Sequence, residues 1–229
     1  MRIAPFALIP LIISGTALAA DLTPTISATN QHLAIAVPAK VKISIGTPAS
    51  LIISGSDADL ALVEIKERDG QLSIGEKSEW FADIEGPLTI QVQLASLSQL
   101  SLAGATEVEI APLTVSELLI EMAGDTRLTA SRLDIETLNL DVAGDGEVTV
   151  KDGRCKTLNA DVAGSGTFDT RALHCVDVTL DVAGAAEGDV YASGSLKVDV
   201  AGASEVRVHG SAKVEQSVVG SAHVTRVNP

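Results

Sequence analysis

The sequence predicts an all-β protein folded as a right-handed, single-stranded parallel β-helix, and three observations favour this class. Glycine recurs every 18 to 20 residues in the second half of the chain. Apolar and polar residues alternate before each of these glycines, and period two is typical of a strand. Aromatic residues make up only 2% of the 229 residues, so the core must be aliphatic. One such repeat cannot bury its own apolar face, and the repeats are therefore expected to stack as coils.

The first element, residues 1–20, has the features of a cleaved secretory signal peptide. Arg2 precedes an apolar stretch at residues 3–13, and small residues at Ala17 and Ala19 lead to Asp21. The apolar stretch is too short to span a bilayer, and a retained N-terminal anchor is the alternative. We therefore expect an exported protein, located in the periplasm, at the cell surface or outside the cell.

The rest of the chain, residues 21–229, is predicted to be one domain whose first part, residues 21–100, is a less regular β region. Asp69 and Gly70 are predicted to form a turn between two apolar runs. Trp80 and Phe81 lie in a polar loop, where they are expected to cap the apolar end of the solenoid, with contact to a partner as the alternative. The apolar runs are residues 33–37, 41–45, 51–53, 72–74 and 88–94.

The second part, residues 101–229, is predicted to form the regular coils. An alternating run such as residues 138–142 ends at a glycine, and a shorter one such as residues 148–150 follows, so each coil carries at least two strands. Small residues recur once per coil, which disfavours a left-handed hexapeptide helix, and the leucine-rich repeat frame is absent. The repeat glycines are Gly104, Gly124, Gly144, Gly164, Gly184, Gly202 and Gly220.

These glycines are interpreted as corner residues at which stacked coils approach one another. Residues 143–146 and 163–166 resemble the start of a dinucleotide-binding fingerprint. No helical pattern follows either segment, and that fingerprint depends on a helix N-terminus. The sequence therefore predicts no nucleotide site.

The order of these motifs resembles a known family. Short strands precede residues 69–74 (Asp-Gly-Gln-Leu-Ser-Ile), the strand at residues 88–90 follows, and residues 97–104 (Leu-Ser-Gln-Leu-Ser-Leu-Ala-Gly) lead into the coils. This pattern is similar to the head GIN domain family of putative auto-transporter adhesins, over nearly the whole chain after residue 20. The resemblance implies an exported right-handed β-helix whose biochemical role is not established.

Cys155 and Cys175 are predicted to form a structural disulfide. Each lies eleven residues after its repeat glycine, so the two are stacked neighbours in adjacent coils. Strands about 4.8 Å apart fall within the Cα separation that a disulfide accepts. A redox-active pair is the alternative, although the chain has no Cys-x-x-Cys motif. Alternation places His174 on the opposite face from Cys175, so it is expected to be a solvated histidine.

An acidic column is the second candidate site. Its carboxylates occupy the same outward position in successive coils, where each adjacent pair repels by roughly 1 kcal/mol even in water. A bound cation such as Ca²⁺, neighbouring Lys or Arg, raised carboxylate pKa values or hydration would offset this repulsion. We expect either a solvated face or a face that binds a cation or a partner. The column comprises Glu121, Asp141, Asp161, Asp181 and Asp199.

Composition excludes several functions. The net charge of −14 and the scarcity of aromatic residues argue against nucleic-acid binding, and no segment after residue 20 predicts a transmembrane helix. His32, His209 and His223 have no Cys or His at metal-ligand spacing, so we predict no metal site, no catalytic residue and no cofactor apart from Ca²⁺ at the column.

The sequence therefore favours a non-enzymatic, adhesin-like binding or structural module of the cell envelope, with an envelope or surface partner that it does not identify. A polysaccharide-acting β-helix enzyme using surface carboxylates is the alternative. Open coil ends present unpaired strand edges, so homo-oligomers are also expected, although Asn228 and Pro229 would discourage them.

Overall fold

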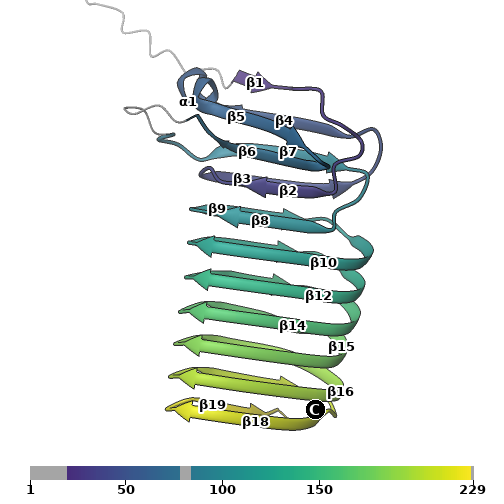
Figure 1. The fold of residues 1–229 in the computed structure, drawn as a ribbon, viewed down its shortest axis with the longest axis vertical. Coiled ribbons are helices and arrows are strands. Elements are labelled where there is room, and N and C mark those ends of the chain that lie inside the picture. The colour runs from purple at the N-terminus through teal and green to yellow at the C-terminus, as the bar shows by residue number, and fades with distance from the viewer. Residues whose placement is uncertain (1–19, 78–83, 228–229) are drawn as a thin grey trace, which may run out of the picture.

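A computed structural model describes residues 20–77 and 84–227, with 72% of residues in β-strands and 3% in helix (Figure 1). The strands join into one continuous sheet that winds into a β-helix of about six turns. This confirms the predicted fold class. The predicted signal peptide apart from Ala20, the predicted capping residues Trp80 and Phe81, and residues 228–229 lie outside the described residues.

The regular coils have two parallel faces. Successive strands on each face pair one coil apart in the chain, as Leu138 does with Leu158 and Val178 with Leu196. One face contains β8, β10, β12, β14 and β18, and the other contains β9, β11, β13, β17 and β19, while the long strands β15 and β16 contribute to both. The bounds are β8 (Gln99–Ala103), β9 (Thr106–Ile110), β10 (Leu113–Gly124), β11 (Thr126–Ala130), β12 (Leu133–Gly144), β13 (Glu147–Val150), β14 (Gly153–Gly164), β15 (Thr167–Gly184), β16 (Glu187–Gly202), β17 (Glu205–His209), β18 (Lys213–Gly220) and β19 (His223–Arg226).

The core is a set of aliphatic ladders inside the coils. Because side chains alternate along a strand, every second residue points inward and meets its equivalent in the next coil. Leu118, Leu138, Leu158, Val178 and Leu196 form one such ladder, and each is at most 2% exposed. Burial of these ladders supplies the main favourable contribution to folding.

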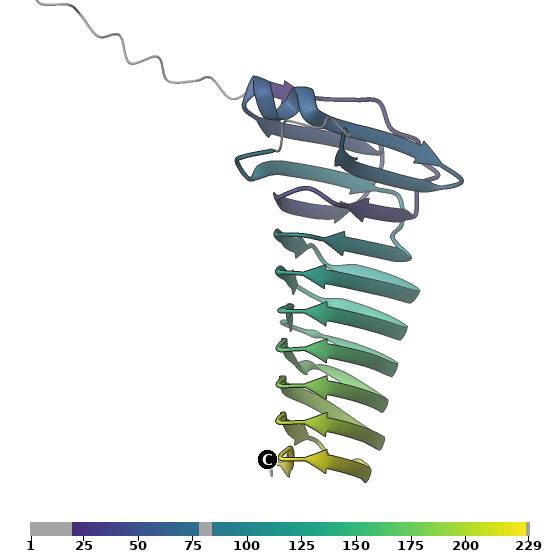
Figure 2. The same ribbon diagram turned by 60° about the vertical axis from the view of Figure 1, so that its left-hand side comes forward.

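The N-terminal region also forms coils, but their spatial order differs from their order in the chain. Strands β2 (His32–Ile35) and β3 (Ala39–Ile45) pair in parallel with β8 and β9 on one side. On the other side they pair with β6 (Gln71–Glu76) and β7 (Leu88–Leu94). The first coil of the chain therefore lies between two coils that come later, and in Figure 2 its dark purple ribbon lies between two teal ones.

Antiparallel strands close this end of the solenoid. β4 (Ser50–Gly55) covers the edge of β7, β1 (Ala20–Leu22) pairs with β4, and β5 (Val63–Arg68) pairs with β6. Asp69 and Gly70, with φ of 52° and 81°, make the predicted turn between β5 and β6. Helix α1 (Asp57–Leu62) follows β4, and the hydroxyl of Ser56 caps it by accepting a hydrogen bond from the Asp59 amide.

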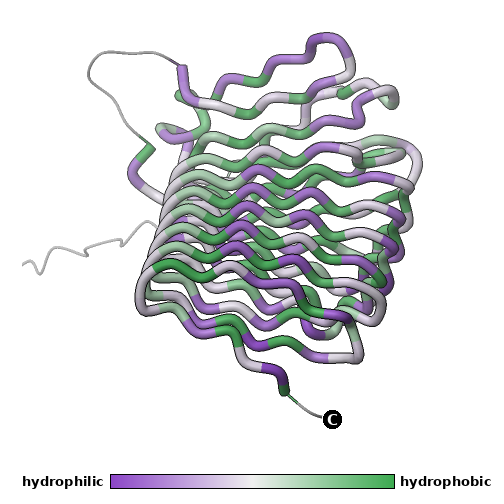
Figure 3. The backbone as a smooth tube through the Cα atoms, turned by 60° about the horizontal axis from the view of Figure 1, so that its bottom comes forward, coloured by the Kyte–Doolittle hydropathy of each residue, from purple (hydrophilic) through white to green (hydrophobic). Residues whose placement is uncertain are grey.

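The opposite end, seen with the last coil in front in Figure 3, carries polar residues at inward positions. Gln216 follows Val198 in its ladder, and Arg226 follows Val208. The Arg226 guanidinium donates a hydrogen bond to the Ala212 carbonyl. Two of the ladders thus end in polar side chains, whereas Val218, which follows Val200, remains 38% exposed.

Candidate functional site: an acidic groove along the solenoid

A groove of about 900 Å³ follows the corner at which the strands of the first face end. It extends from β2 through every coil to β18. Two columns of outward-pointing side chains line it side by side, with buried aliphatic residues between them. We call this groove the acidic groove. The first column is Ala34, Ser101, Glu121, Asp141, Asp161, Asp181, Asp199 and Ser217, and the second is Ala36, Ala103, Ala123, Ala143, Ala163, Ala183, Ala201 and Val219.

The repeated Asp-Val-Ala-Gly segment explains why the groove forms. In residues 161–164, Val162 points into the core, while Asp161 and Ala163 point outward because side chains alternate. Gly164 then turns the chain with a φ of +135°. The alanine side chain is small, so the corner stays hollow. A larger outward side chain would fill it.

The carboxylates of the column lie in register across adjacent coils, as the sequence predicts. Asp141 pairs with Asp161, Asp161 with Asp181, and Asp181 with Asp199. Backbones of paired strands are about 4.8 Å apart, so the negative charges are held in single file. Mutual repulsion is the consequence, and the ends and the middle of the column differ in how it is offset.

At the two ends, neighbouring side chains stabilise the charge. Ser101 Oγ and Gln99 Nε2 donate hydrogen bonds of 2.6 and 3.0 Å to Glu121 Oε2, and these bonds lower the pKa of the Glu121 carboxyl. At the other end, Lys197 Nζ lies 2.7 Å from Asp199 Oδ2. Both terminal carboxylates are therefore stabilised by groups of the chain itself.

The three middle carboxylates have fewer direct contacts of this kind. Within the described residues, Asp141, Asp161 and Asp181 form neither an ion pair nor a side-chain hydrogen bond. Desolvation raises the pKa of Asp141, and the nearby charges of Asp161 and Glu121 raise it further. The charge of Asp181 raises the pKa of Lys197, so that lysine partly offsets it, and the negative charge without a neighbouring cation lies at Asp141 and Asp161.

On the second face, stacked acidic side chains are paired with lysine or arginine. Lys40 lies 3.5 Å from Glu107, and Lys42 lies 3.7 Å from Glu109, each across adjacent coils. Arg127 Nε lies 2.6 Å from Glu147 Oε2 one coil away. Lysine and arginine therefore pair acids on the second face, whereas in the described part of the chain the carboxylates of the acidic groove have one neighbouring cation, Lys197, which pairs with Asp199 and also interacts with Asp181.

The column does not form a calcium shell. In the part of the chain that the structure describes, no group of three His, Cys, Asp or Glu residues is arranged to hold a metal ion. Ca²⁺ takes six to eight oxygen ligands around one point, whereas these carboxylates follow a line. The expectation of Ca²⁺ at the column therefore gains no support from the geometry.

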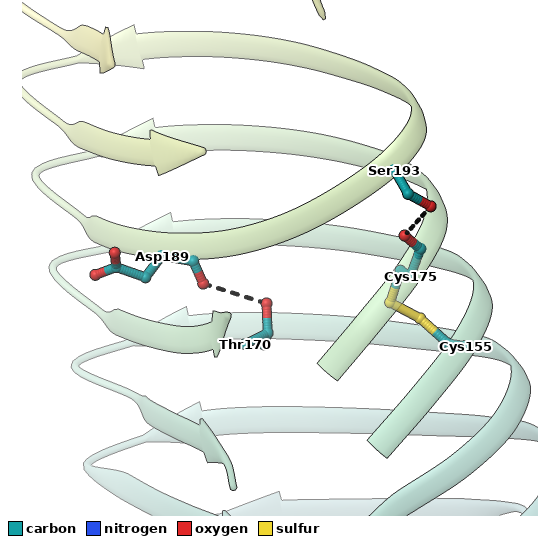
Figure 4. The surroundings of a disulfide bond; sticks show 5 residues. All are labelled: Cys155, Thr170, Cys175, Asp189 and Ser193. Atoms are coloured by element: carbon teal, nitrogen blue, oxygen red, sulfur yellow. Dashed lines mark hydrogen bonds between the residues drawn. A yellow bond between two sulfur atoms is a disulfide. The ribbon is translucent and has the colours of Figure 1, made fainter. Parts of the chain in front are cut away.

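The predicted disulfide is present (Figure 4). Cys155 on β14 and Cys175 on β15 are bonded, with their Cα atoms 4.4 Å apart and both side chains in the core. Ser193 Oγ donates a 3.3 Å hydrogen bond to the Cys175 carbonyl from the next coil. His174 is exposed, as predicted, and its ring stacks on Tyr191 with centroids 4.3 Å apart. Neither cysteine of the disulfide lines the acidic groove.

A buried charge cluster was not predicted from the sequence. Asp189 accepts hydrogen bonds from Arg207 Nη2 at 2.8 Å, and its Oδ1 lies 2.9 Å from His209 Nε2. The Asp189 side chain is only 12% exposed, and the bonds from Arg207 lower the pKa of its carboxyl. The spacing of 18 residues between Asp189 and Arg207, one short coil, is the signal that would have indicated this contact.

The fold and the acidic groove define a class of protein, a parallel β-helix with a long open groove along one corner. The chain belongs to the family described as "Putative auto-transporter adhesin, head GIN domain", which it matches over residues 31–212. This confirms the resemblance seen in the sequence. No curated protein matches the chain.

Solved structures share the fold at low sequence identity. The crystal structure of a putative adhesin from Bacteroides fragilis is 19% identical, with a TM-score of 0.80. That of a putative adhesin from Parabacteroides merdae is 15% identical, with a TM-score of 0.73, and that of a putative lipid binding protein from Parabacteroides distasonis is 18% identical, with a TM-score of 0.71. Each match covers 93% of this chain and 98% of the other. At these identities the comparisons establish the fold alone.

Among the described residues, no helix has the length and apolar character needed to cross a membrane.

Proposed function

We propose that the protein is an exported, non-enzymatic binding module of the cell envelope and that the acidic groove is its contact surface. The observation that carries the proposal is the row of stacked carboxylates along an open groove, in which Asp141 and Asp161 have no ion pair or side-chain hydrogen bond among the described residues. Repulsion within this column costs stability, and a cationic partner would relieve it. Membership of an adhesin family supports a binding role.

Export is the second part of the proposal. Residues 1–20 carry the pattern of a secretory signal, and the disulfide between Cys155 and Cys175 suits an oxidising compartment. The adhesin family supports the same location. The partner would then be a component of the envelope or of another surface.

A polysaccharide-acting enzyme is the second candidate, and one observation favours it. Glu121 and Asp141 are neighbours in the groove, and their pKa values are shifted in opposite directions. A general acid and a general base need such a difference. However, among the described residues no aromatic, Arg or Lys side chain lines the groove, so this part of the chain supplies no stacking platform for sugars and no lining cation for a charged transition state.

Accessibility on intact cells tests the location. The chain is expressed with its own residues 1–20 in a bacterium with an outer membrane, and protease digestion is followed with an antibody, using a periplasmic protein as the lysis control. Digestion indicates surface exposure, and protection until the outer membrane is opened indicates the periplasm. Retention of the protein in the cytoplasm, with residues 1–20 uncleaved, would contradict export.

Binding to isolated envelopes tests the groove. Asp161→Asn/Asp181→Asn removes two adjacent groove carboxylates, and Asp125→Asn/Asp145→Asn removes two exposed carboxylates of adjacent coils outside the groove lining. We expect the first variant to lose at least tenfold in envelope binding and the second to retain it. Equal binding by all three proteins would overturn the role of the groove. Turnover of acidic polysaccharides that disappears in Glu121→Gln and Asp141→Asn would favour the enzyme instead.

A further inference from the structure

We draw no further inference here: the strongest candidate, the outer edge of β18 and β19 in the last coil, where Val218 and Val219 are 38% and 68% exposed, carries no proposal because nothing in the described part of the chain shows what covers it.

Discussion

Gly164 stacks so closely on Gly144 that a Cβ atom on Gly164 would lie 2.2 Å from the Gly144 carbonyl oxygen. Its φ of +135° is also one that residues with a side chain rarely adopt. The corner of the acidic groove therefore depends on the absence of a side chain. The same relationship recurs between Gly184 and Gly164, where the distance is 2.1 Å.

Gly164→Ala is therefore expected to lower the free energy of unfolding by about 2 kcal/mol or more, because both the backbone conformation and the contact become strained. Gly75→Ala is the matched control, since a Cβ there would have no atom within 4 Å. It should change the free energy by less than about 0.5 kcal/mol. Urea unfolding measures both, and equal stability of the two variants would contradict the role of the corner.

The disulfide should contribute substantially to stability. Cys155 and Cys175 are 20 residues apart, and closing a loop of this length stabilises a protein by roughly 3 kcal/mol through the entropy of the unfolded chain. Cys155→Ala/Cys175→Ala should therefore unfold at lower urea concentration than the oxidised parent. A reducing agent should destabilise the parent and leave the variant unchanged. An unchanged midpoint for the variant would mean that the bond adds nothing.

Asp141→Asn should raise the melting temperature at neutral pH by a few degrees at most. The pKa of Asp141 is raised in the folded protein, so the folded state binds a proton more readily than the unfolded state. The cost of the charged form is therefore present above the raised pKa and disappears as the pH falls toward 3.8. The gain from Asn should shrink over that range, and a gain that is constant from pH 7 to pH 3 would contradict this account.

Asp189 should show the opposite dependence on pH. Hydrogen bonds from Arg207 lower the pKa of Asp189, so its contribution to stability is present above 3.8 and is lost as the pH falls below that value. Asp189→Asn should reduce the melting temperature by several degrees at neutral pH and by less in acid. Asp145→Asn, at an exposed position, serves as the control. A loss that is equal at both pH values would show that the charge is not responsible.

The polar end of the solenoid is expected to limit association. Gln216 and Arg226 take inward positions in the last coil, beside partly buried Val214 and Val224. Gln216→Val/Arg226→Val would extend the aliphatic ladders to an open edge, and we expect dimers or larger assemblies that grow with concentration. Sedimentation velocity measures this. A variant that keeps the parent's sedimentation coefficient at every concentration would contradict a protective role.

The regular coils could be predicted from the sequence because every repeat has the same alternation of apolar and polar residues before its glycine. Period-two alternation and the glycine spacing fix which side chains point inward, so the register of Asp141 with Asp161 and the pairing of Cys155 with Cys175 follow from counting residues. The resemblance to the head GIN family rests on the same patterned segments.

Other features could not be predicted because they depend on contacts between segments that share no repeat. Helix α1 is only six residues long and has no buried residue, so it leaves no periodic signal. The interior position of β2 and β3 depends on which strand edges remain free after the chain folds. The alanine column of the groove does recur in the repeat, but a small residue has no distinctive chemistry in the sequence, and the hollow appears only when seven alanines stack.

The interior position of β2 and β3 has a consequence for the order of assembly. Their residues leave the ribosome, and any export channel, before both of the coils that flank them. The first coil must therefore remain unpaired until residues 71–110 arrive, and only then can the capped end and the repeats join into one body. Contacts so distant in the chain form slowly. An export chaperone that shields residues 32–45 during this interval would act on the one coil that holds the two halves of the molecule together.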